Sequence, residues 1–310
     1  MIFNVRLGED RLACLVIVGV SPTVAKRSLP YCRSVSMKSP TRMIYELKQP
    51  SSNVLAIDCP FPEALAVIEG NNPGWVFADD LNTPRTALVW AQGVEGFYLV
   101  GEPDSTVFLE YLNDYIDQVL KPRLHDSGAT WFEVSGGENW NPVIESTFEK
   151  RNLESSQQWV YTLKPMTYKA AIQPETVGDC KLLRIDRHLL YDFSVSNAFL
   201  HSRLALFWGS ENAFLKAGLG YVLVCGEEIA SLCCSGFVSG STHAIDIETE
   251  ASHRRKGYAE AVAKAFIAEC VERHFQPYWD CMAENVASVQ LAEKLGFTRS
   301  HTYTLYSFPL

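Results

Sequence analysis

The segment 245–259 combines the residue types that bind a phosphate group. Its Arg254-x-x-Gly257-x-Ala259 pattern places a residue without a Cβ where the chain must turn sharply, between a strand-like apolar run and an alanine-rich helical stretch. Consecutive backbone N–H groups at a helix start can face an anion, and the basic run Arg254–Lys256 adds charge beside them. The segment is therefore predicted to bind a pyrophosphate, although an ordinary helix with a basic first turn explains the turn alone equally well.

The residues after this turn predict an amphipathic helix that would hold it in place. Apolar residues recur there at three- and four-residue spacing and form one stripe. The stripe consists of Ala259, Val262, Ala263, Phe266, Ile267 and Cys270. Neither G-x-x-x-x-G-K-[ST] nor a G-x-G-x-x-G between a strand and a helix occurs, which excludes two other phosphate-binding motifs.

A second strand and helix are predicted about twenty residues further along the chain. The apolar-rich run Tyr278–Met282 suits a strand, and Gly296 is a natural C-cap for the helix that follows. Asn285 and Ser288 lie three residues apart at the start of this helix. Side chains there either cap the helix or reach a ligand beyond the strand end, and capping is the ordinary role of such an asparagine.

Together, R-x-x-G-x-A, the helix and then W-D-C-x-x-x-N-x-x-S-x-x-x-A-E-K-L-G-F resemble the acetyl-CoA-binding half of the GNAT acetyltransferase superfamily. The resemblance covers residues 43–310, and the fuller pattern looks like the subgroup that contains the zwittermicin A resistance acetyltransferases. The segments that carry this fuller pattern are Phe207–Leu215, Gly218–Val224, Glu228–Val238, Asn71–Asp80 and Gly96–Gly101.

The resemblance implies an α+β fold with a mixed, mostly antiparallel sheet flanked by helices, and an additional N-terminal αβ domain. The expected organisation is a leader at 1–42, an N-terminal αβ domain at 43–165 and a GNAT domain at 166–310. If an internal repeat is present, the N-terminal domain is a degenerate GNAT-like half. Acetyl-CoA is the implied co-substrate, and it would bind the second half only. Its predicted contacts are Ile247, Thr249, Arg254, Arg255, Lys256, Gly257, Tyr258, Ala259, Asn285 and Ser288.

Two carboxylates on the strand before the basic turn are the candidates for a general base. Asp246 and Glu248 are two residues apart and hence share one face of a strand. Acetyl transfer needs a deprotonated amine and a polarised thioester, and a backbone N–H near Ile247 or Thr249 would serve the second need. Both carboxylates also suit an ordinary solvent-facing role on the strand.

The sequence does not single out one residue as the acid that would protonate the leaving thiolate. Many superfamily members carry a tyrosine four residues before the Gly-Phe pair, whereas this chain has Ala292. Water, Tyr303 or Tyr306 would then have to supply the proton. Both tyrosines are equally consistent with aromatic core residues of the last strand.

The first half of the chain predicts further strands and helices. Strands are expected at Trp75–Ala78, Thr86–Ala91, Gly96–Val100 and 158–163, and helices at 106–120 and from the N-cap Asn141 to about Lys150. A boundary is expected between Pro165 and Gly178. Glu149-Lys150 followed by Tyr161-Thr-Leu163 parallels Glu293-Lys294 followed by Tyr303-Thr-Leu305, a faint sign of an internal repeat.

The composition favours a protein of the cytoplasm that binds neither nucleic acid nor a metal ion. A net charge of −9 and a pI near 5.3 argue against nucleic acid as the main partner and leave room for a cationic amine. Nine cysteines without a C-x-x-C pair favour reduced thiols in the cytoplasm, and no metal site is expected from the histidine spacing. No apolar run reaches the ~20 residues of a membrane span, and Leu12–Val20 lacks the charged flank of a signal peptide.

The leading functional hypothesis is an N-acetyltransferase that moves an acetyl group from acetyl-CoA to an amine of a small molecule by direct attack. A non-catalytic acyl-CoA-binding sensor is the alternative, and Ala292 is the residue that favours it. A scaffold protein is a third possibility, and it would leave the basic turn without a role.

Overall fold

The computed structural model describes residues 44–48, 58–163, 176–191 and 194–310, which belong to one compact unit. The expected leader at 1–42 and most of the expected boundary segment lie outside the described residues. The helices are α1 (Pro62–Ile68), α2 (Thr106–Tyr115), α3 (Lys121–Asp126), α4 (Asn141–Thr147), α5 (Arg187–Leu190), α6 (Ala198–Phe207), α7 (Glu211–Ala217), α8 (Tyr258–Glu272) and α9 (Val286–Lys294).

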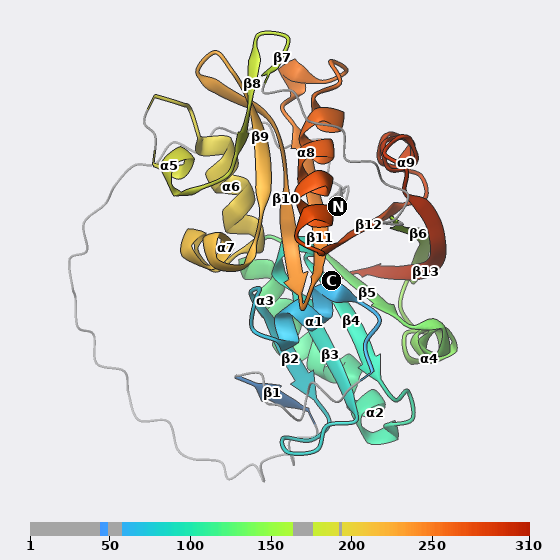
Figure 1. The fold of residues 1–310 in the computed structure, drawn as a ribbon. Coiled ribbons are helices and arrows are strands. Elements are labelled where there is room, and N and C mark those ends of the chain that lie inside the picture. The colour runs from blue at the N-terminus through green and yellow to red at the C-terminus, as the bar shows by residue number, and fades with distance from the viewer. Residues whose placement is uncertain (1–43, 49–57, 164–175, 192–193) are drawn as a thin grey trace, which may run out of the picture. The chain divides into compact units, whose positions relative to one another are not determined.

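All described strands join one mixed sheet in the order β1-β2-β3-β4-β5-β13-β6-β12-β11-β10-β9-β8-β7 (Figure 1). The strands are β1 (Tyr45–Leu47), β2 (Gly74–Ala78), β3 (Thr86–Ala91), β4 (Gly96–Gly101), β5 (Trp131–Gly136), β6 (Glu154–Thr162), β7 (Thr176–Val177), β8 (Cys180–Arg184), β9 (Gly220–Cys225), β10 (Glu228–Ser239), β11 (Thr242–Thr249), β12 (Gln276–Met282) and β13 (Thr298–Pro309). The expected α+β fold, with a mostly antiparallel sheet flanked by helices, is confirmed.

The same topology occurs twice along the chain. In the first half β2, β3 and β4 are antiparallel neighbours, α2 and α3 follow, and β5 returns parallel to β4. In the second half β9, β10 and β11 are antiparallel neighbours, α8 follows, and β12 returns parallel to β11. The faint sequence parallel does not fall at matching places. Glu149-Lys150 lies after α4 and 161–163 lies at the end of β6, whereas Glu293-Lys294 lies within α9 and 303–305 lies in the middle of β13.

The two halves exchange their last strands. β6, which ends the first half, pairs with β12 of the second half, and β13, which ends the second half, pairs with β5 of the first. The two exchanged strands also pair with each other over nine register positions from Thr298↔Thr162 to Ser307↔Glu154. Each half therefore completes its sheet with a strand that the other half supplies.

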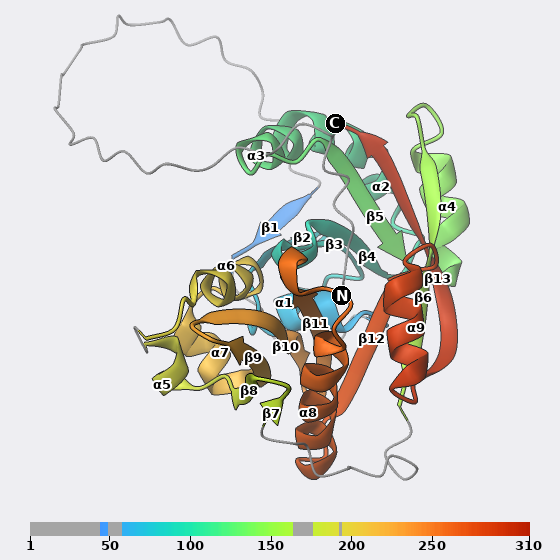
Figure 2. The same cartoon turned by 90° about the horizontal axis from the view of Figure 1, so that it is seen from above.

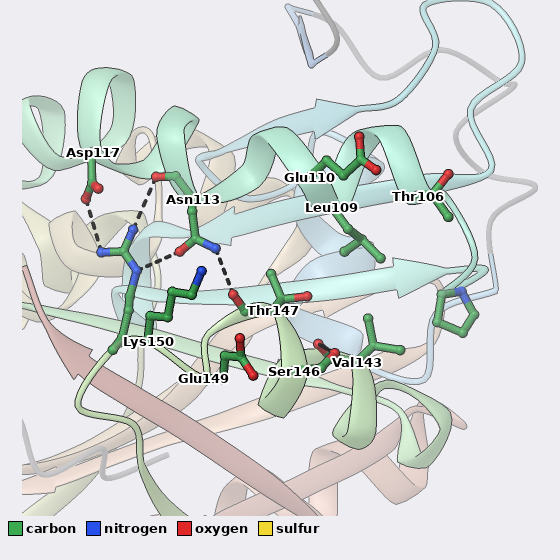
Figure 3. Close-up of a pocket in the computed structure, with 12 residues that line it drawn as sticks. Thr106, Leu109, Glu110, Asn113, Asp117, Val143, Ser146, Thr147, Glu149 and Lys150 are labelled. Atoms are coloured by element: carbon green, nitrogen blue, oxygen red, sulfur yellow. Dashed lines mark hydrogen bonds and ion pairs between the residues drawn. The ribbon is translucent and has the colours of Figure 1, made fainter.

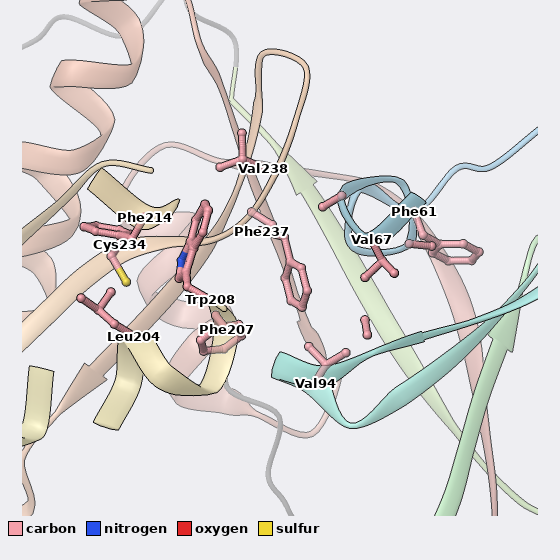
Figure 4. Packing of buried hydrophobic residues seen from close by; sticks show 14 of the residues in the cluster. Phe61, Val67, Val94, Leu204, Phe207, Trp208, Phe214, Cys234, Phe237 and Val238 are labelled. Carbon is pink, nitrogen blue, oxygen red and sulfur yellow. The ribbon is translucent and has the colours of Figure 1, made fainter. Parts of the chain in front are cut away.

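Helices cover the two faces of the sheet differently. α8 and α9 pack on one face through a cluster that includes Val262, Phe266 and Ala292. On the other face α1 and α6 share a cluster with the inward side chains of β10, including Phe237, whose surroundings are drawn in Figure 4. Figure 2 shows α1 beside β10 and β11, and it also contacts β2 and β3. α1 thus links the two halves on the face opposite α8.

Four expectations about local structure in the first half need correction. The helix expected at 106–120 continues to Asp126, because a π-helical turn at Ile116–Leu120 connects α2 to α3. Asn141 is the first helical residue of α4 rather than its cap, since a 3₁₀ turn at Glu138–Trp140 precedes it. α4 ends at Thr147, and β6 begins four residues earlier than expected.

The expectation that the cysteines are reduced fails at one pair. Cys180 and Cys225 are register partners on β8 and β9, and a disulfide joins them. Five further described cysteines are free thiols. None of the described helices has the length and apolar character needed to cross a membrane.

Candidate active site

The parallel strands β11 and β12 diverge soon after they begin. Their pairing covers only Thr242–Ala244 and Gln276–Tyr278, although β11 runs to Thr249 and β12 to Met282. From Tyr278 onward β12 pairs with β6 on its other side, and β11 keeps its partner β10 throughout. Because ladder hydrogen bonds hold neighbouring strands about 4.8 Å apart, the loss of pairing opens a gap between the second halves of these strands.

Two backbone donors of β11 face this gap. The N–H of Glu250 donates to the carbonyl of Ala230 at 3.0 Å, so these two residues form a hydrogen-bonded pair. Along an antiparallel ladder, opposing residues alternate between pairs that are joined by backbone hydrogen bonds and pairs that are not. Ile247 opposes Cys233 and Thr249 opposes Ser231, which are the non-bonded positions in this alternation. The N–H groups of Ile247 and Thr249 therefore point away from β10 and toward the side of β12.

The turn after β11 presents a helix N-terminus to solvent. Gly257 is the N-cap of the fifteen-residue helix α8 and has φ of 79°, and Arg255 has φ of 62°. Both lie in the left-handed region that favours glycine. A Cβ on Gly257 would meet no described atom within 4 Å, so the space over this N-terminus is open to a ligand. The first amides of α8 lack intrahelical partners and carry the positive end of the helix dipole.

The three basic residues of this turn differ in what they contact. Arg254 donates from Nε to the carbonyl of Thr249 at 3.2 Å and forms an ion pair with Glu248 at 3.1 Å. Lys256 lies 3.5 Å from His253 Nδ1 and over the ring of Tyr258. Arg255 is exposed on the turn. Arg254 thus positions the turn, whereas Arg255 and Lys256 add charge at its surface.

The two candidate bases occupy different environments. Asp246 is fully buried, and both of its oxygens accept hydrogen bonds from Arg203 of α6, one of them at 3.1 Å. Glu248 is a quarter exposed, at 26%, and faces the same side of β11 two residues closer to the turn before α8. Both oxygens of the buried Asp246 carboxylate accept bonds from Arg203, whereas the partly exposed Glu248 accepts from Arg254 at Oε1. Glu248 is therefore the better placed of the two to accept a proton.

The predicted contacts at the start of α9 are engaged within the protein. Asn285 is the N-cap, and its side chain accepts a bond from the N–H of Ser288 at 3.2 Å. Ser288 is 1% exposed, and its hydroxyl accepts a bond from Trp279 Nε1 at 3.0 Å. Ser288 therefore fixes Trp279 instead of presenting its hydroxyl to a ligand. Tyr258, at the start of α8, places its hydroxyl 3.3 Å from Cys180 Sγ.

A surface groove lies elsewhere, between α2 and α4 (Figure 3). It encloses about 850 Å³ and is lined by residues such as Thr106, Glu110 and Lys150. Asn113 donates to the carbonyl of Thr147 at 2.7 Å and accepts a bond from Arg151 Nε at 2.7 Å. The central polar side chains of this groove serve to join two helices, so its size alone assigns it no chemistry.

Comparison with known proteins identifies the family. The family described as GNAT acetyltransferase matches residues 63–306, which is most of the chain. The chain belongs to the GNAT acetyltransferase family. A relative from Bacillus subtilis, described as the uncharacterized N-acetyltransferase YdfB, is 28% identical over 243 residues, 78% of this chain and 88% of the relative.

Solved GNAT structures share the fold. A GCN5-related N-acetyltransferase-like protein from Streptococcus suis superimposes with a TM-score of 0.54 at 23% identity, over 80% of this chain and 94% of the other. A GCN5-related N-acetyltransferase from Kribbella flavida gives a TM-score of 0.52 at 10% identity, again over 80% and 94% of the two chains. The protein is a GNAT-type enzyme.

Within this GNAT fold the positions considered for a general acid are either without a proton or engaged with other residues. Ala292 is fully buried beside α8 and has no proton to give. The hydroxyl of Tyr303 donates to Asp280 at 2.7 Å, and that of Tyr306 donates to Glu145 of α4 at 2.9 Å. Burial is the largest cause that raises the pKa of Tyr306, to about 12.

The sequence patterns of the GNAT domain did not reveal Glu63 and Asp280 as a pair. Glu63 lies on α1 and Asp280 on β12, both buried, and burial raises the pKa of each carboxyl group. They are 217 positions apart in the sequence, so no local pattern joins them. The signals were a glutamate after a helix-starting proline, Phe61-Pro62-Glu63, and an aspartate inside an apolar strand.

Proposed function

We propose that this GNAT enzyme is an N-acetyltransferase that moves an acetyl group from acetyl-CoA to a primary amine of a small molecule. The observation that carries the proposal is the divergence of β11 and β12 next to the exposed N-terminus of α8. A gap between two strands suits an extended thioester arm, and a helix N-terminus suits its pyrophosphate. Acetyl-CoA is a molecule with both parts.

The residues of the turn fit such a pyrophosphate. The amides at the start of α8 would donate to its oxygens, and Arg255 and Lys256 would add charge-assisted contacts. Gly257 keeps the space above these amides open. The N–H of Ile247 or Thr249 would donate to the thioester oxygen, where negative charge develops during attack.

Glu248 is the proposed general base. A lysine-like ammonium lies about 3 pK units above neutrality, which costs roughly 4–5 kcal/mol to deprotonate. A proton passes from the ammonium to Glu248, directly or through one water, and the amine nitrogen then attacks the thioester carbonyl carbon. A C–N bond forms, the C–S bond breaks, and the second N–H proton leaves to solvent.

Water is the proposed proton donor to the departing thiolate. Ala292 offers no proton, and the hydroxyl of Tyr303 is committed to Asp280. A thiol is among the more acidic side-chain-like groups, with a pKa near 8.5, so its thiolate leaves without a strong acid. The products are the acetylated amine and free CoA thiol.

We further propose that the protein is a member of the zwittermicin A resistance subgroup, which its sequence resembles. Membership favours an aminopolyol or an amino sugar as the acceptor, and the net charge of −9 is compatible with a cationic substrate. The cytoplasm is the proposed location, since acetyl-CoA is available there as a co-substrate.

The test is a screen of primary amines for free thiol release from acetyl-CoA, with the binding of acetyl-CoA measured calorimetrically on the same protein. The expected outcome is micromolar to millimolar binding of acetyl-CoA and faster thiol release with at least one amine. A protein that does not bind acetyl-CoA would contradict the proposal. Binding without release from any aminopolyol, amino sugar or polyamine would contradict the choice of acceptor.

A further inference from the structure

A cluster of buried polar side chains lies on the sheet face that α1 covers. Asp280 is on β12, and Gln158 of β6 pairs with both Met282 of β12 and Tyr303 of β13. Side chains directly opposite on neighbouring strands share a face. Asp280 and Gln158 are 1% exposed and Tyr303 is 9% exposed, and Glu63 of α1 is 0% exposed. Phe61, which precedes Glu63 by two residues, packs edge-on against the ring of Tyr303 at 5.1 Å, and this contact brings the start of α1 to these side chains. The acidic cluster consists of Glu63, Gln158, Asp280 and Tyr303.

The acidic cluster has more hydrogen-bonding atoms than partners. Tyr303 donates to Asp280 Oδ2, but Asp280 Oδ1, both carboxylate oxygens of Glu63 and both polar atoms of the Gln158 amide have no partner among the residues that the structure describes. A buried polar atom without a partner costs about 1–3 kcal/mol. Five such atoms together are unfavourable unless a ligand completes their bonds.

The charges of the acidic cluster point to a cation. Burial raises the pKa of Glu63, and the nearby Asp280 raises it further. Burial, together with these carboxylates, also raises the pKa of Tyr98, Tyr278 and Tyr303. Two buried carboxyl groups, one of which raises the pKa of the other, cannot both ionise without a compensating positive charge. A bound cation would supply that charge and let both become carboxylates.

The acidic cluster lies next to the gap between β11 and β12. Asp280 is two residues beyond Tyr278, where the pairing of the two strands ends. Its neighbours Trp279 and Cys281 face α8, so Asp280 faces the opposite side. Glu248 also faces away from α8, because Ile247 belongs to the α8 cluster. The proposed base and the acidic cluster are therefore on the same side of the sheet.

We propose that Glu63 and Asp280 bind the ammonium group of the acceptor and that Gln158 binds a hydroxyl group beside it. An ammonium has three N–H donors for the carboxylate oxygens, and the Gln158 amide offers one donor and one acceptor to a neighbouring hydroxyl. The described residues hold no His, Cys, Asp and Glu group arranged for a metal ion, which favours an organic cation. The acceptor class is thus a vicinal amino alcohol. Its acetylation rests on the proposed function above, whereas its binding does not.

The test is calorimetric titration of the full chain with ethanolammonium at pH 7.5 in the absence of acetyl-CoA. Ethylene glycol has the same length without the charge and serves as the ligand control. The Glu63→Gln and Asp280→Asn variants each remove one carboxylate and keep the shape of the side chain. Glu110→Gln, on the exposed face of α2, makes the same change in net charge and serves as the protein control.

The expected result is saturable binding of ethanolammonium to the wild type and to Glu110→Gln, with affinity at least tenfold weaker in Glu63→Gln and Asp280→Asn. Ethylene glycol should not bind. The proposal is overturned if the wild type does not bind ethanolammonium saturably, or if both cluster variants bind it as tightly as the control. Circular dichroism melts identify a misfolded variant, and the other cluster variant then decides.

Acetyl-CoA titrations on the same proteins separate this proposal from the proposed function. The turn at Gly257 belongs to a different set of residues, so Glu63→Gln and Asp280→Asn should bind acetyl-CoA as the wild type does. A wild type that does not bind acetyl-CoA would contradict the transferase proposal. The ammonium proposal would not be affected, because the ethanolammonium titration tests it separately.

Discussion

At the scale of single residues, Arg254 joins the two parts of the candidate active site. Its guanidinium contacts Glu248 on β11 and the carbonyl of Thr249, while its backbone belongs to the turn that opens α8. A half-exposed ion pair of this kind contributes about 0–1 kcal/mol to stability. Its more useful effect is to hold the Glu248 carboxylate in one position beside the strand gap.

Replacing Glu248 with glutamine should lower turnover by ~10²–10⁴ and leave acetyl-CoA affinity nearly unchanged, because proton transfer is lost while the glutamine oxygen can still accept a hydrogen bond from Arg254. The measurement is thiol release on an accepted amine at several pH values. Glu250→Gln is the matched control, since Glu250 is exposed two residues further along. Full turnover by Glu248→Gln would place the base elsewhere, and Asp280 would be the next carboxylate to examine.

His243 should make stability fall on the acid side of neutrality. Burial, with Arg273 nearby, lowers the pKa of His243 to about 4. The unfolded chain, with a histidine pKa near 6.5, binds the proton first as pH falls, so protonation favours unfolding between pH 6.5 and 4. At pH 5 this amounts to about 2 kcal/mol relative to pH 7.

Urea unfolding of the wild type and of His243→Gln at pH 7 and pH 5 measures this effect. The difference in unfolding free energy between the two proteins should change by about 2 kcal/mol between these pH values, to the disadvantage of the wild type at pH 5. An unchanged difference would show that His243 titrates normally in the folded protein.

At the scale of elements, the turn before α8 depends on Gly257. Gly257→Val should weaken acetyl-CoA binding at least tenfold, because a branched side chain would fill the open space above the α8 amides. Gly240 is the matched control, since its φ of 54° is also left-handed and its surroundings are equally open among the described residues.

Both glycine variants should lose about 1–2 kcal/mol of stability through backbone strain, and only Gly257→Val should lose affinity. Calorimetry with acetyl-CoA and thermal melts give the two quantities. Equal affinity in the two variants would remove the turn from the cofactor site.

The second half was predictable because its elements are local and strongly patterned. α8 begins at Tyr258, directly after the glycine, and buries the expected stripe except for Ala259, which is partly buried. Gly296 follows the end of α9 with φ of 90°. The helix expected at 106–120 continues past Pro122, a residue that breaks a regular helix in its interior. The π-helical turn just before it changes the backbone bonding that the proline would otherwise break.

What the sequence could not supply is contact between distant segments. Asp246 reads as a solvent-facing carboxylate until the fold brings Arg203 from α6 against it. The acidic cluster likewise needs α1, β6, β12 and β13 together, and no periodicity encodes which strand lies beside which. The disulfide between Cys180 and Cys225 has the same origin, since it follows from the register of β8 and β9.

At the scale of the whole molecule, the exchange of β6 and β13 makes the halves depend on each other. Phe308 of β13 stacks on Phe132 of β5 at 4.9 Å and lies 5.1 Å from Phe148, inside the core of the first half. Trp159 of β6 packs against the α8 cluster of the second half. Neither half has a complete core without the strand of the other.

Residues 166–310 produced alone should therefore be aggregated or lack a cooperative melt, because β12 loses its partner β6 and becomes an exposed edge. Mixing this fragment with residues 43–165 during refolding should restore a cooperative transition by circular dichroism. A fragment 166–310 that melts cooperatively by itself would show that the exchange is not needed for folding.

The position of β13 also fixes the order of events during synthesis. A ribosome adds about 5–20 residues per second, so Phe308 follows Phe148 after a delay on the order of ten to thirty seconds. Throughout that interval the first half of the nascent chain has its other core aromatic residues, but β13, the strand that pairs with β5, has not yet been made. The free edge of β5 can therefore pair with other chains. Translation speed and chaperone supply should thus govern the soluble yield of this protein more than its final stability does.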